Sequence, residues 1–216
     1  MDQLVEQFLH SPKMEIYLEQ INQVRREEQL ARERFLDEST EDEKAEFING
    51  EKIVHSPVRY EANEARRRLC RLASTFVDVH RLGRLSDEKL LISLTRNDYE
   101  PDICYWRSEK SSAFEPKQMR FPAPDWIVEV LSPSTEANDR GVKFEDYAGH
   151  GVAEYWIVDA DRQIVEQYTL FNGNYQLLLK SGSGTVRSEV IAGFEIPIIA
   201  IFDDAENLRV LKTLLA

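Results

Sequence analysis

The chain has 216 residues, a length that suits one globular domain with an appendage better than two full domains. Its formal net charge is −12, which argues against indiscriminate nucleic-acid binding, because proteins that bind phosphate backbones in that way carry a basic surface. It has no apolar run of about 18 residues and no signal-peptide pattern at its start, so we expect a soluble, cytoplasmic protein without a membrane segment.

Acidic residues are concentrated between Glu27 and Glu46, so the rest of the chain is closer to neutral and leaves room for a local basic strip. The two cysteines, Cys70 and Cys104, fall in segments whose patterns indicate a helix and a strand. We therefore interpret them as small apolar side chains in a reducing compartment and not as part of a zinc site.

The first predicted element is a helix over residues 13–37, which lack Gly and Pro, are rich in helix-forming residues and follow a Ser-Pro start. Its apolar residues form only a ragged stripe, made of Ile16, Ile21, Val24, Leu30, Phe35 and Leu36. Such a helix needs a partner surface. We predict that residues 1–44 form a helical arm, packed on its own domain or on the second subunit of a homodimer, and that the domain covers residues 45–216.

From residue 45 the pattern changes to a hairpin, because the pair Asn49-Gly50 separates apolar-rich runs at residues 46–48 and 52–55. A helix is predicted over residues 61–80, and its apolar face consists of Ala65, Leu69, Leu72, Ala73, Phe76 and Val79. We interpret the arginines on its other face as a solvated surface, with a phosphate track as the alternative: Arg59, Arg66, Arg67, Arg68 and Arg71.

The middle of the chain is predicted to form strands at residues 90–94, 102–106, 126–131, 153–158 and 163–168. Residues 139–148 are predicted to form a helix, with Asp139 as its N-cap and Gly149 or Gly151 as its stop. Strand, helix and strand in this order indicate a right-handed crossover between parallel strands. Two further strands, joined by a Gly-Ser turn, and a closing helix are expected at residues 175–180, 186–191 and 207–215.

Two acids lie at the ends of apolar strands: Asp102 follows Pro101, and Glu129 precedes the break at Ser132-Pro133. Burying a carboxylate among apolar residues is unfavourable unless it is paired or binds a metal. Where a strand ends at such a break, its side chains can point into a cleft while the backbone stays rigid. Two carboxylates there would bind a hard divalent cation, and Mg²⁺ is the best match because it takes few protein ligands and keeps several waters.

Lys143 lies in the helix that follows, where it is a candidate to orient the nucleophile or to stabilise the pentacoordinate phosphate. Asp139, Lys143 and Tyr147 recur every four residues and share one helix face, which simple surface pairing would also explain. A lysine in the first turn is slightly disfavoured by the helix dipole, so we expect another interaction to hold it there.

The chain resembles the Uma-two family, which belongs to the PD-(D/E)XK nuclease superfamily, over one long block: Pro124-Asp125-Trp126-Ile127-Val128-Glu129-Val130-Leu131-Ser132-Pro133-Ser134-Thr135, then Asp139, Lys143, Tyr147, Gly151-Val152 and residues 154–159. Residues 46–51 and Pro101-Asp102 resemble that family's upstream motifs, so the similarity covers residues 46–202. The resemblance implies an α/β fold with a restriction-endonuclease-like core, in which a mixed sheet is flanked by helices. It also implies phosphodiester hydrolysis with acidic residues and a divalent metal.

The resemblance implies a role for each matching residue. Asp102 matches the first acid of the family's motif and Glu129 the second, and both would be ligands of Mg²⁺ or Mn²⁺. Leu131 stands where the superfamily usually places its lysine, and Lys143 lies where this family takes the lysine from the following helix. Glu46 matches an upstream acid that would complete the site, with Glu61 left open as the alternative. The histidine that many relatives carry after the Ser-Pro turn is unmatched, because the chain reads Arg59-Tyr60-Glu61-Ala62-Asn63.

We therefore predict a metal-dependent endonuclease with DNA as its substrate and Asp102, Glu129, Lys143 and Glu46 as its catalytic residues. One alternative is a non-catalytic binding or regulatory protein of the same fold, which an acidic cleft would favour. The other is a two-carboxylate hydrolase of sugars, which needs aromatic residues around the cleft and no Lys143. We assign no role to the histidines, because they lack metal-ligand spacing: His55, His80 and His150.

Overall fold

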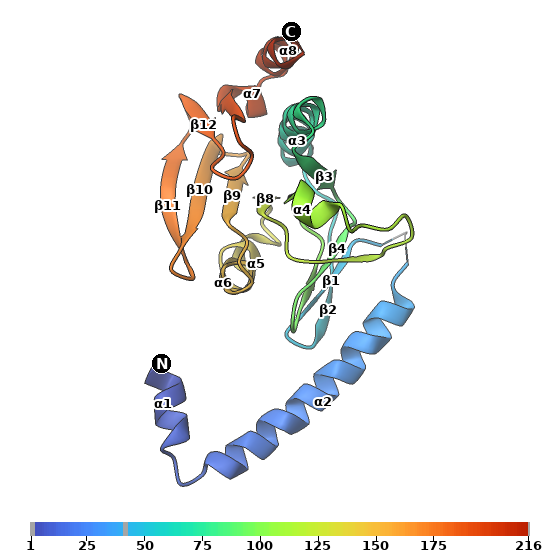
Figure 1. Cartoon of the computed structure of the whole chain (residues 1–216), viewed down its shortest axis with the longest axis vertical. Coiled ribbons are helices and arrows are strands. Elements are labelled where there is room, and N and C mark those ends of the chain that lie inside the picture. Colours follow the sequence, from blue (N-terminus) through green and yellow to red (C-terminus); the bar gives the residue numbers. More distant parts are fainter. Residues whose placement is uncertain (1–2, 41–42, 216) are drawn as a thin grey trace.

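The computed structural model describes residues 3–40 and 43–215 (Figure 1). Its largest element is a six-stranded mixed sheet in the order β11-β10-β9-β8-β6-β3, in which β8 and β9 run parallel and the other neighbours antiparallel. The strands are β3 (Gly83–Asp87), β6 (Ile103–Arg107), β8 (Trp126–Val130), β9 (Glu154–Asp159), β10 (Ile164–Phe171) and β11 (Asn174–Ser181). The mixed α/β fold and the parallel pair confirm the predicted fold class.

A smaller, five-stranded sheet has the order β2-β1-β5-β4-β7. Its strands are β1 (Ala45–Ile48), β2 (Glu51–Val54), β4 (Leu91–Ser93), β5 (Asp98–Tyr99) and β7 (Arg120–Phe121). The predicted hairpin is present, with Asn49 and Gly50 at φ values of 51° and 91° that suit this turn. Strand β5 leads through residues 100–102 into β6, so the two sheets are joined directly beside Asp102.

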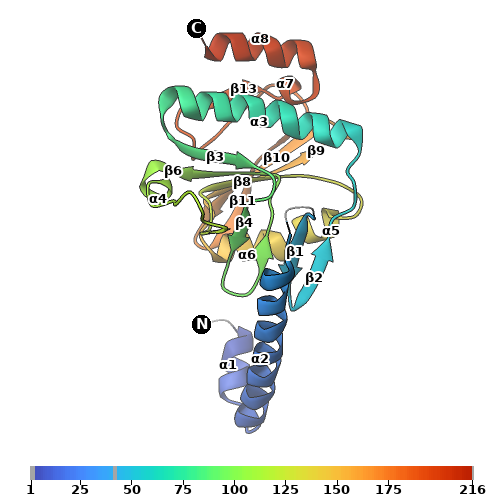
Figure 2. The same cartoon turned by 90° about the vertical axis from the view of Figure 1, so that its right-hand side faces the viewer.

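Alternate side chains of the large sheet enter two separate apolar cores. On one face, Tyr105, Val128 and Trp156 pack with helix α3 (Tyr60–His80) and with the segment that carries α7 (Ile199–Phe202) and α8 (Asp204–Leu214). On the other face, Ile127 and Tyr155 pack with helix α6 (Val142–Gly149) and the small sheet. Figure 2 shows these layers, with α3 and α8 above the sheet and α6 below it. The period of two puts Glu129 on the same face as Ile127, toward α6.

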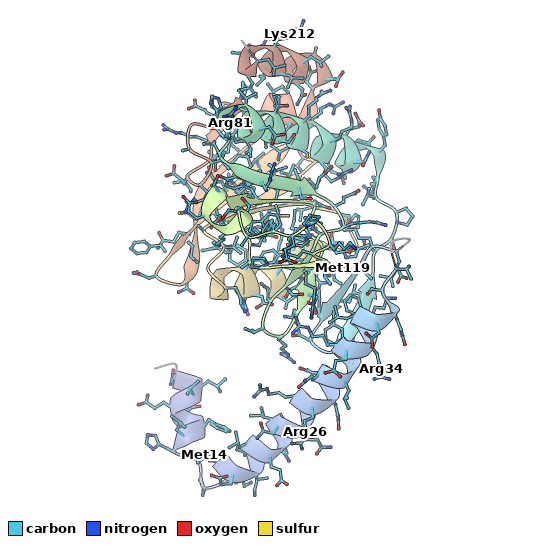
Figure 3. The ribbon with its side chains drawn as sticks, turned by 45° about the vertical axis from the view of Figure 1, so that its right-hand side comes forward. Met14, Arg26, Arg34, Arg81, Met119 and Lys212 are labelled. Carbon is cyan, nitrogen blue, oxygen red and sulfur yellow. The ribbon has the colours of Figure 1, made fainter. Side chains whose placement is uncertain are left out.

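The arm consists of α1 (Gln3–Leu9) and α2 (Met14–Glu38), and it extends away from the domain; Figure 3 shows Met14 at its far end. The last turns of α2 pack on the small sheet. The ring of Phe35 lies 5.6 Å from that of Phe47, and Arg32 Nη2 donates a 2.8 Å hydrogen bond to Asp98 Oδ1. Four residues of the predicted stripe are instead 47–60% exposed: Ile16, Ile21, Val24 and Leu30. The arm therefore packs on its own domain through its C-terminal part, and the domain boundary at residue 44 stays a prediction.

Three local predictions were wrong. Val79 is 51% exposed and Val77 is buried instead, so the buried face of α3 is turned toward Val77 and leaves Val79 at its edge. The helix over residues 139–148 is interrupted, so that Asp139 ends the short helix α5 (Glu136–Asp139) and is not the N-cap of α6. Residues 186–191 form a strand only in β12 (Thr185–Arg187), which pairs with β13 (Glu195–Pro197) and not with β11.

Several short elements had no sequence signal strong enough to predict them: β3, β5, β7, β13, α7 and α4 (Ser108–Ser111). Cys104 is buried in the second core and Cys70 packs against the first, which agrees with their interpretation as apolar side chains. Among the described residues, no helix combines the length and the apolar character needed to cross a membrane.

Candidate active site

The ladder between β6 and β8 places Asp102 and Glu129 side by side. Ile103 pairs with Val128, so Asp102 and Glu129 are the next residues outward on the two antiparallel strands. The backbone N–H of Asp102 makes a long contact of 3.4 Å with Glu129 Oε2, and Asp102 Oδ2 accepts a 2.8 Å hydrogen bond from the backbone N–H of Val130. The structure thus brings both predicted acids to one end of the sheet.

Lys143 reaches Glu129 because the chain breaks its helix just before it. Helix α5 ends at Asp139, Gly141 takes the N-cap position of α6, and Lys143 lies in the first turn of α6. A Cβ atom on Gly141 would lie 2.7 Å from the carbonyl oxygen of Ala137, closer than ordinary contact allows. Glycine therefore permits the two helices to meet at this angle.

The ammonium of Lys143 lies among three buried carboxylates. Its Nζ atom is 2.9 Å from Glu46 Oε1, 3.0 Å from Glu129 Oε1 and 3.1 Å from Asp139 Oδ1. Asp139 Oδ1 lies outside the direction of a regular hydrogen bond, so its interaction with Lys143 is chiefly electrostatic. The hydroxyl of Tyr147 donates a 3.0 Å hydrogen bond to Glu129 Oε1. The face shared by Asp139, Lys143 and Tyr147 is therefore buried in the site and does not form a surface pair.

Glu46 enters the site from the hairpin. Its Oε1 atom also accepts a 3.0 Å hydrogen bond from the backbone N–H of Glu100, and His55 Nε2 lies 3.1 Å from its Oε2 atom. Glu61 is exposed in the first turn of α3, so Glu46 is the acid of the two that the structure brings to Lys143. His55, to which the sequence assigned no role, thus lies in the site. The predicted hairpin could have indicated this position of His55, because pairing of the two strands brings His55 beside Lys44. The carbonyl oxygen of Lys44 accepts a hydrogen bond from the backbone N–H of His55.

The carboxyl groups of this cluster differ in their pKa values. Burial, together with repulsion from Asp139, Asp102 and Glu46, raises the pKa of Glu129 to about 8 despite the attraction of Lys143. Burial also raises the pKa of Asp139. Burial also opposes the ionised form of Glu46. Attraction and hydrogen bonding by Lys143 and His55 outweigh burial and lower the pKa of Glu46 to about 2.

The pKa of Lys143 itself is raised well above its ordinary value, because attraction by Glu129, Glu46 and Asp139 outweighs the desolvation of the ammonium. The site thus contains a permanent buried cation. The acids around this cation titrate as one coupled group, in which Glu129 has the raised pKa of about 8.

A cleft of about 350 Å³ opens onto this cluster. Its charged and polar lining residues are Lys44, His55, Ser56, Glu88, Lys89, Asp102, Glu129, Ser132, Thr135, Asp139 and Lys143. Lys44 was missed by sequence reasoning, and its Nζ atom lies 2.9 Å from Asp102 Oδ1. Burial lowers the pKa of Lys44, but attraction to Asp102 and Glu129 outweighs burial, so the pKa is raised. Lys44 and Glu46 are two residues apart, and this spacing puts both side chains on one side of an extended segment. The spacing could therefore have indicated that Lys44 lies in the same site as Glu46.

The donor set of the cleft fits a magnesium-like cation. Glu129 Oε1 accepts from Lys143 and Tyr147, whereas the contact of Glu129 Oε2 within the described residues is the long one with the backbone of Asp102. Four acids face two lysines, which leaves two negative charges when all are ionised: Glu46, Asp102, Glu129 and Asp139 against Lys44 and Lys143. In the part of the chain that the structure describes, no three His, Cys, Asp or Glu residues form a ready-made metal cage. Magnesium is commonly held by one or two carboxylates and its own waters.

The arginines of α3 do not form a track toward the cleft. Each is engaged within the chain: Arg66 with Asp87, Arg67 with Glu64, Arg68 with the carbonyl of Phe202, and Arg71 with Asn207. Their role is to join α3 to the neighbouring β3, α7 and α8, and the phosphate-track alternative receives no support from these contacts.

A mixed sheet flanked by helices, with two acids at paired strand ends and a lysine from the next helix, defines a protein with a restriction-endonuclease-like core. The chain belongs to the Uma2 family, described as "Putative restriction endonuclease", whose sequence profile matches residues 27–199. The resemblance seen in the motifs is therefore confirmed for the family.

The uncharacterized protein slr1290 of Synechocystis is 39% identical to this chain over 87 residues, which cover 38% of the chain. The match spans 43% of the length of that relative. A crystal structure from Anabaena variabilis, described as "a putative nuclease belonging to DUF820", has the same fold, with a TM-score of 0.68 and 20% identity. The match covers 78% of this chain and 94% of that one.

Proposed function

We propose that the protein is a cytoplasmic, metal-dependent endonuclease that hydrolyses phosphodiester bonds in DNA. The observation that carries this proposal is the meeting of Asp102 and Glu129 at one cleft, with Lys143 buried behind them. Two acids beside a lysine can bind a divalent cation and keep a positive charge close to a phosphoryl group. Membership of a family described as restriction endonucleases supports DNA as the substrate.

In this proposal Asp102 and Glu129 bind Mg²⁺, with Mn²⁺ as the alternative. When bound, such an ion lowers the pKa of a water molecule and neutralises charge on phosphoryl oxygens. Lys143 is the fixed cation of the site, and Glu46 supports it by remaining ionised beside it. The backbone N–H of Glu100 in turn donates a hydrogen bond to the carboxylate of Glu46, and His55 Nε2 lies beside its other oxygen.

A homodimer is part of the proposal, because helix α2 of the arm exposes apolar side chains that its own domain does not cover. Two-fold symmetry would match that of a DNA duplex. The four exposed stripe residues are Ile16, Ile21, Val24 and Leu30.

The test is cleavage of labelled single- and double-stranded DNA with Mg²⁺, with Mn²⁺ or with a chelator, beside the same reactions on RNA. We expect cleavage of DNA that requires a divalent cation. Cleavage that persists in the chelator would remove the metal from the proposal, and preferential cleavage of RNA would replace the substrate. If no substrate is cut and calorimetry detects no divalent cation bound, the enzyme proposal is wrong.

A second candidate is a non-catalytic binding or regulatory protein of the same fold. The observation that favours it is the internal pairing of the site, in which Lys143 pairs with three acids and Lys44 pairs with Asp102 without any metal. A site stabilised in this way can be retained for structure alone. Nucleic-acid binding without metal-dependent cleavage would support this candidate. The sugar-hydrolase alternative requires aromatic side chains around the cleft, and none of the described residues that line it is Phe, Tyr or Trp.

A further inference from the structure

Lys143 is badly placed to touch a substrate. Three carboxylate oxygens lie within 3.1 Å of its Nζ atom, so three buried acids already depend on its charge. Its side chain is 1% exposed, so the floor of the cleft covers it almost completely. To reach a phosphate, Lys143 would have to leave buried acids without a counter-charge, which is strongly unfavourable.

Lys44 is placed differently. Its side chain is 21% exposed at the wall of the same cleft, and among the described residues its Nζ atom has one carboxylate partner, Asp102 Oδ1 at 2.9 Å. Its backbone is fixed, because the carbonyl oxygen of Lys44 accepts the N–H of His55. The side chain can therefore change partner without disturbing the strand that brings Glu46 into the site.

The partner of Lys44 is an atom that the proposed metal needs. Asp102 Oδ2 already accepts the backbone N–H of Val130, so Oδ1 is the oxygen of this carboxylate with the greater freedom to bind a cation. An ammonium and a divalent ion at one carboxylate oxygen repel each other. Binding of the ion would therefore weaken the salt bridge between Asp102 and Lys44.

We infer that Lys44, and not Lys143, is the lysine that contacts the substrate phosphate, and that it pairs with Asp102 until a divalent cation takes that place. This inference rests on the proposed function. A lysine ammonium is a compact charge that binds phosphate oxygens well, and its flexible stem allows the exchange of partners. Lys143 then acts as a positioning residue, which keeps Glu46, Glu129 and Asp139 together.

The simpler account is that Lys44 and Asp102 form an ordinary salt bridge near the surface, of small energetic value. The chain contains a matched control for it. At the other end of β8, Lys110 Nζ lies 2.9 Å from Asp125 Oδ1, and Asp125 Oδ2 accepts a 2.8 Å hydrogen bond from the backbone N–H of Arg107. This pair repeats the carboxylate contacts of Lys44 and Asp102, with a further hydrogen bond from Lys110 to the carbonyl of Ala123, and lies outside the cleft.

The experiment compares Lys44→Gln, Lys44→Arg and the control Lys110→Gln in the full-length protein. Calorimetry with Mn²⁺ alone measures the metal affinity, and cleavage of a labelled DNA duplex measures kcat and KM. We expect Lys44→Gln to bind Mn²⁺ several-fold more tightly, because a competing charge is gone, and to cut on the order of a hundredfold more slowly. Lys44→Arg should recover part of the rate, and Lys110→Gln should change neither quantity.

The outcomes separate this inference from the proposed function. If the wild type cuts DNA and Lys44→Gln cuts equally fast, the inference is overturned while the nuclease stands. If the wild type cuts nothing, the proposed function fails. The Mn²⁺ titration still tests whether the ion displaces Lys44 from Asp102. Tighter Mn²⁺ binding by Lys44→Gln supports this displacement, and unchanged binding overturns it. Should Lys44→Gln not fold, Lys44→Met provides the same comparison.

Discussion

Asp102 and Glu129 are joined by reciprocal contacts across the ladder of β6 and β8. The backbone N–H of Asp102 approaches Glu129 Oε2, while the carboxylate of Asp102 accepts the backbone N–H that follows Glu129, at Val130. Each acid is thus oriented by the strand that carries the other. Rigid strand ends that fix each other's side chains are the kind of support that a metal site requires.

Removing the charge of either acid should abolish metal-dependent cleavage. Asp102→Asn keeps an acceptor for Val130, and Glu129→Gln keeps the shape of the side chain, so both proteins should remain folded. Each loses a charged ligand of an ion that prefers its own waters, and we expect the affinity for Mn²⁺ to fall by at least about tenfold, since even outer-shell changes cost that much. Calorimetry and the cleavage assay measure these effects.

Asp125→Asn is the control for this pair of variants, because Asp125 makes the same backbone and lysine contacts at the far end of β8. It should bind Mn²⁺ and cut DNA like the wild type. A comparable loss in Asp125→Asn would mean that the effect comes from general destabilisation of the strand and not from a metal ligand.

The affinity for the metal should rise with pH. The pKa of Glu129 is raised to about 8 by burial and by its acidic neighbours, and the ionised carboxylate is the form that binds a cation. Below that value one proton must leave for each ion bound, so the affinity should rise by about tenfold per pH unit and level off above it. Mn²⁺ titrations from pH 6 to 9 test this, and an affinity that does not change over the range would contradict it.

The stability of the metal-free protein should change in the opposite direction. Because the folded pKa of Glu129 lies above the ordinary value of 4.5, the folded state holds a proton that the unfolded state has lost between pH 4.5 and about 8. This group therefore contributes stability at acid pH that disappears as the pH rises through that window. Melting curves in a chelator should show the decrease for the wild type and a smaller decrease for Glu129→Gln.

Lys143→Met should be strongly destabilising. It leaves Glu46, Glu129 and Asp139 buried beside one another without their cation, and breaking a buried pair in this way typically costs about 3–5 kcal/mol. Part of this loss should be recovered in the double variant Lys143→Met/Glu46→Gln, because Glu46, whose pKa is lowered to about 2, is the neighbour that stays ionised. The coupling free energy from urea unfolding should be about 0.5–3 kcal/mol, as for other residues in contact. Strict additivity of the two changes would show that they do not interact.

The sequence predicted the parts of this site that depend on local patterns. The apolar runs placed Asp102 and Glu129 at strand ends, and the pair Asn49-Gly50 placed the hairpin that carries Glu46. The salt bridge of Lys44 with Asp102 could not be predicted in this way. It joins residues 58 positions apart and depends on how β5 passes into β6, a relation between two sheets that no short pattern encodes.

The break before α6 was also missed, for a different reason. The spacing of Asp139, Lys143 and Tyr147 is helical throughout, so periodicity favoured one continuous helix. A single glycine, Gly141, ends that continuity, because the close approach of the Ala137 carbonyl is a steric fact of the folded chain. Gly alone within a helical pattern costs about 1 kcal/mol and does not by itself predict a break.

Gly141→Ala should therefore disturb the site from a distance. Its methyl group would meet the carbonyl oxygen of Ala137 at 2.7 Å, so the start of α6 must shift and carry Lys143 with it. We expect a loss of stability of about 1–3 kcal/mol, typical of forced overpacking. Misplacement near 1 Å can lower the cleavage rate by about a hundredfold. Gly149→Ala, at the end of the same helix, meets nothing within 4 Å and is the control. Equal effects of the two variants would contradict the steric argument.

The arm gives the last prediction, which concerns assembly. Its C-terminal part is fixed to the domain by Phe35 and Arg32, whereas the far half exposes Ile16, Ile21 and Val24. Deleting residues 1–24 should therefore leave the unfolding midpoint of the domain nearly unchanged and convert a dimer into a monomer in sedimentation experiments. The single change Ile21→Asp should weaken the dimer in the full-length chain, because it places a charge within an apolar contact.

Leu177→Asp is the control for Ile21→Asp, because Leu177 is an apolar residue of β11 that is 53% exposed, close to the 47% of Ile21, and it lies outside the arm. It should leave the sedimentation coefficient unchanged. An arm that assembles two copies predicts that deletion and Ile21→Asp act alike on the oligomeric state and that neither alters cleavage by a single site. If the full-length chain sediments as a monomer, or if the deletion leaves a dimer intact, the arm does not join two subunits.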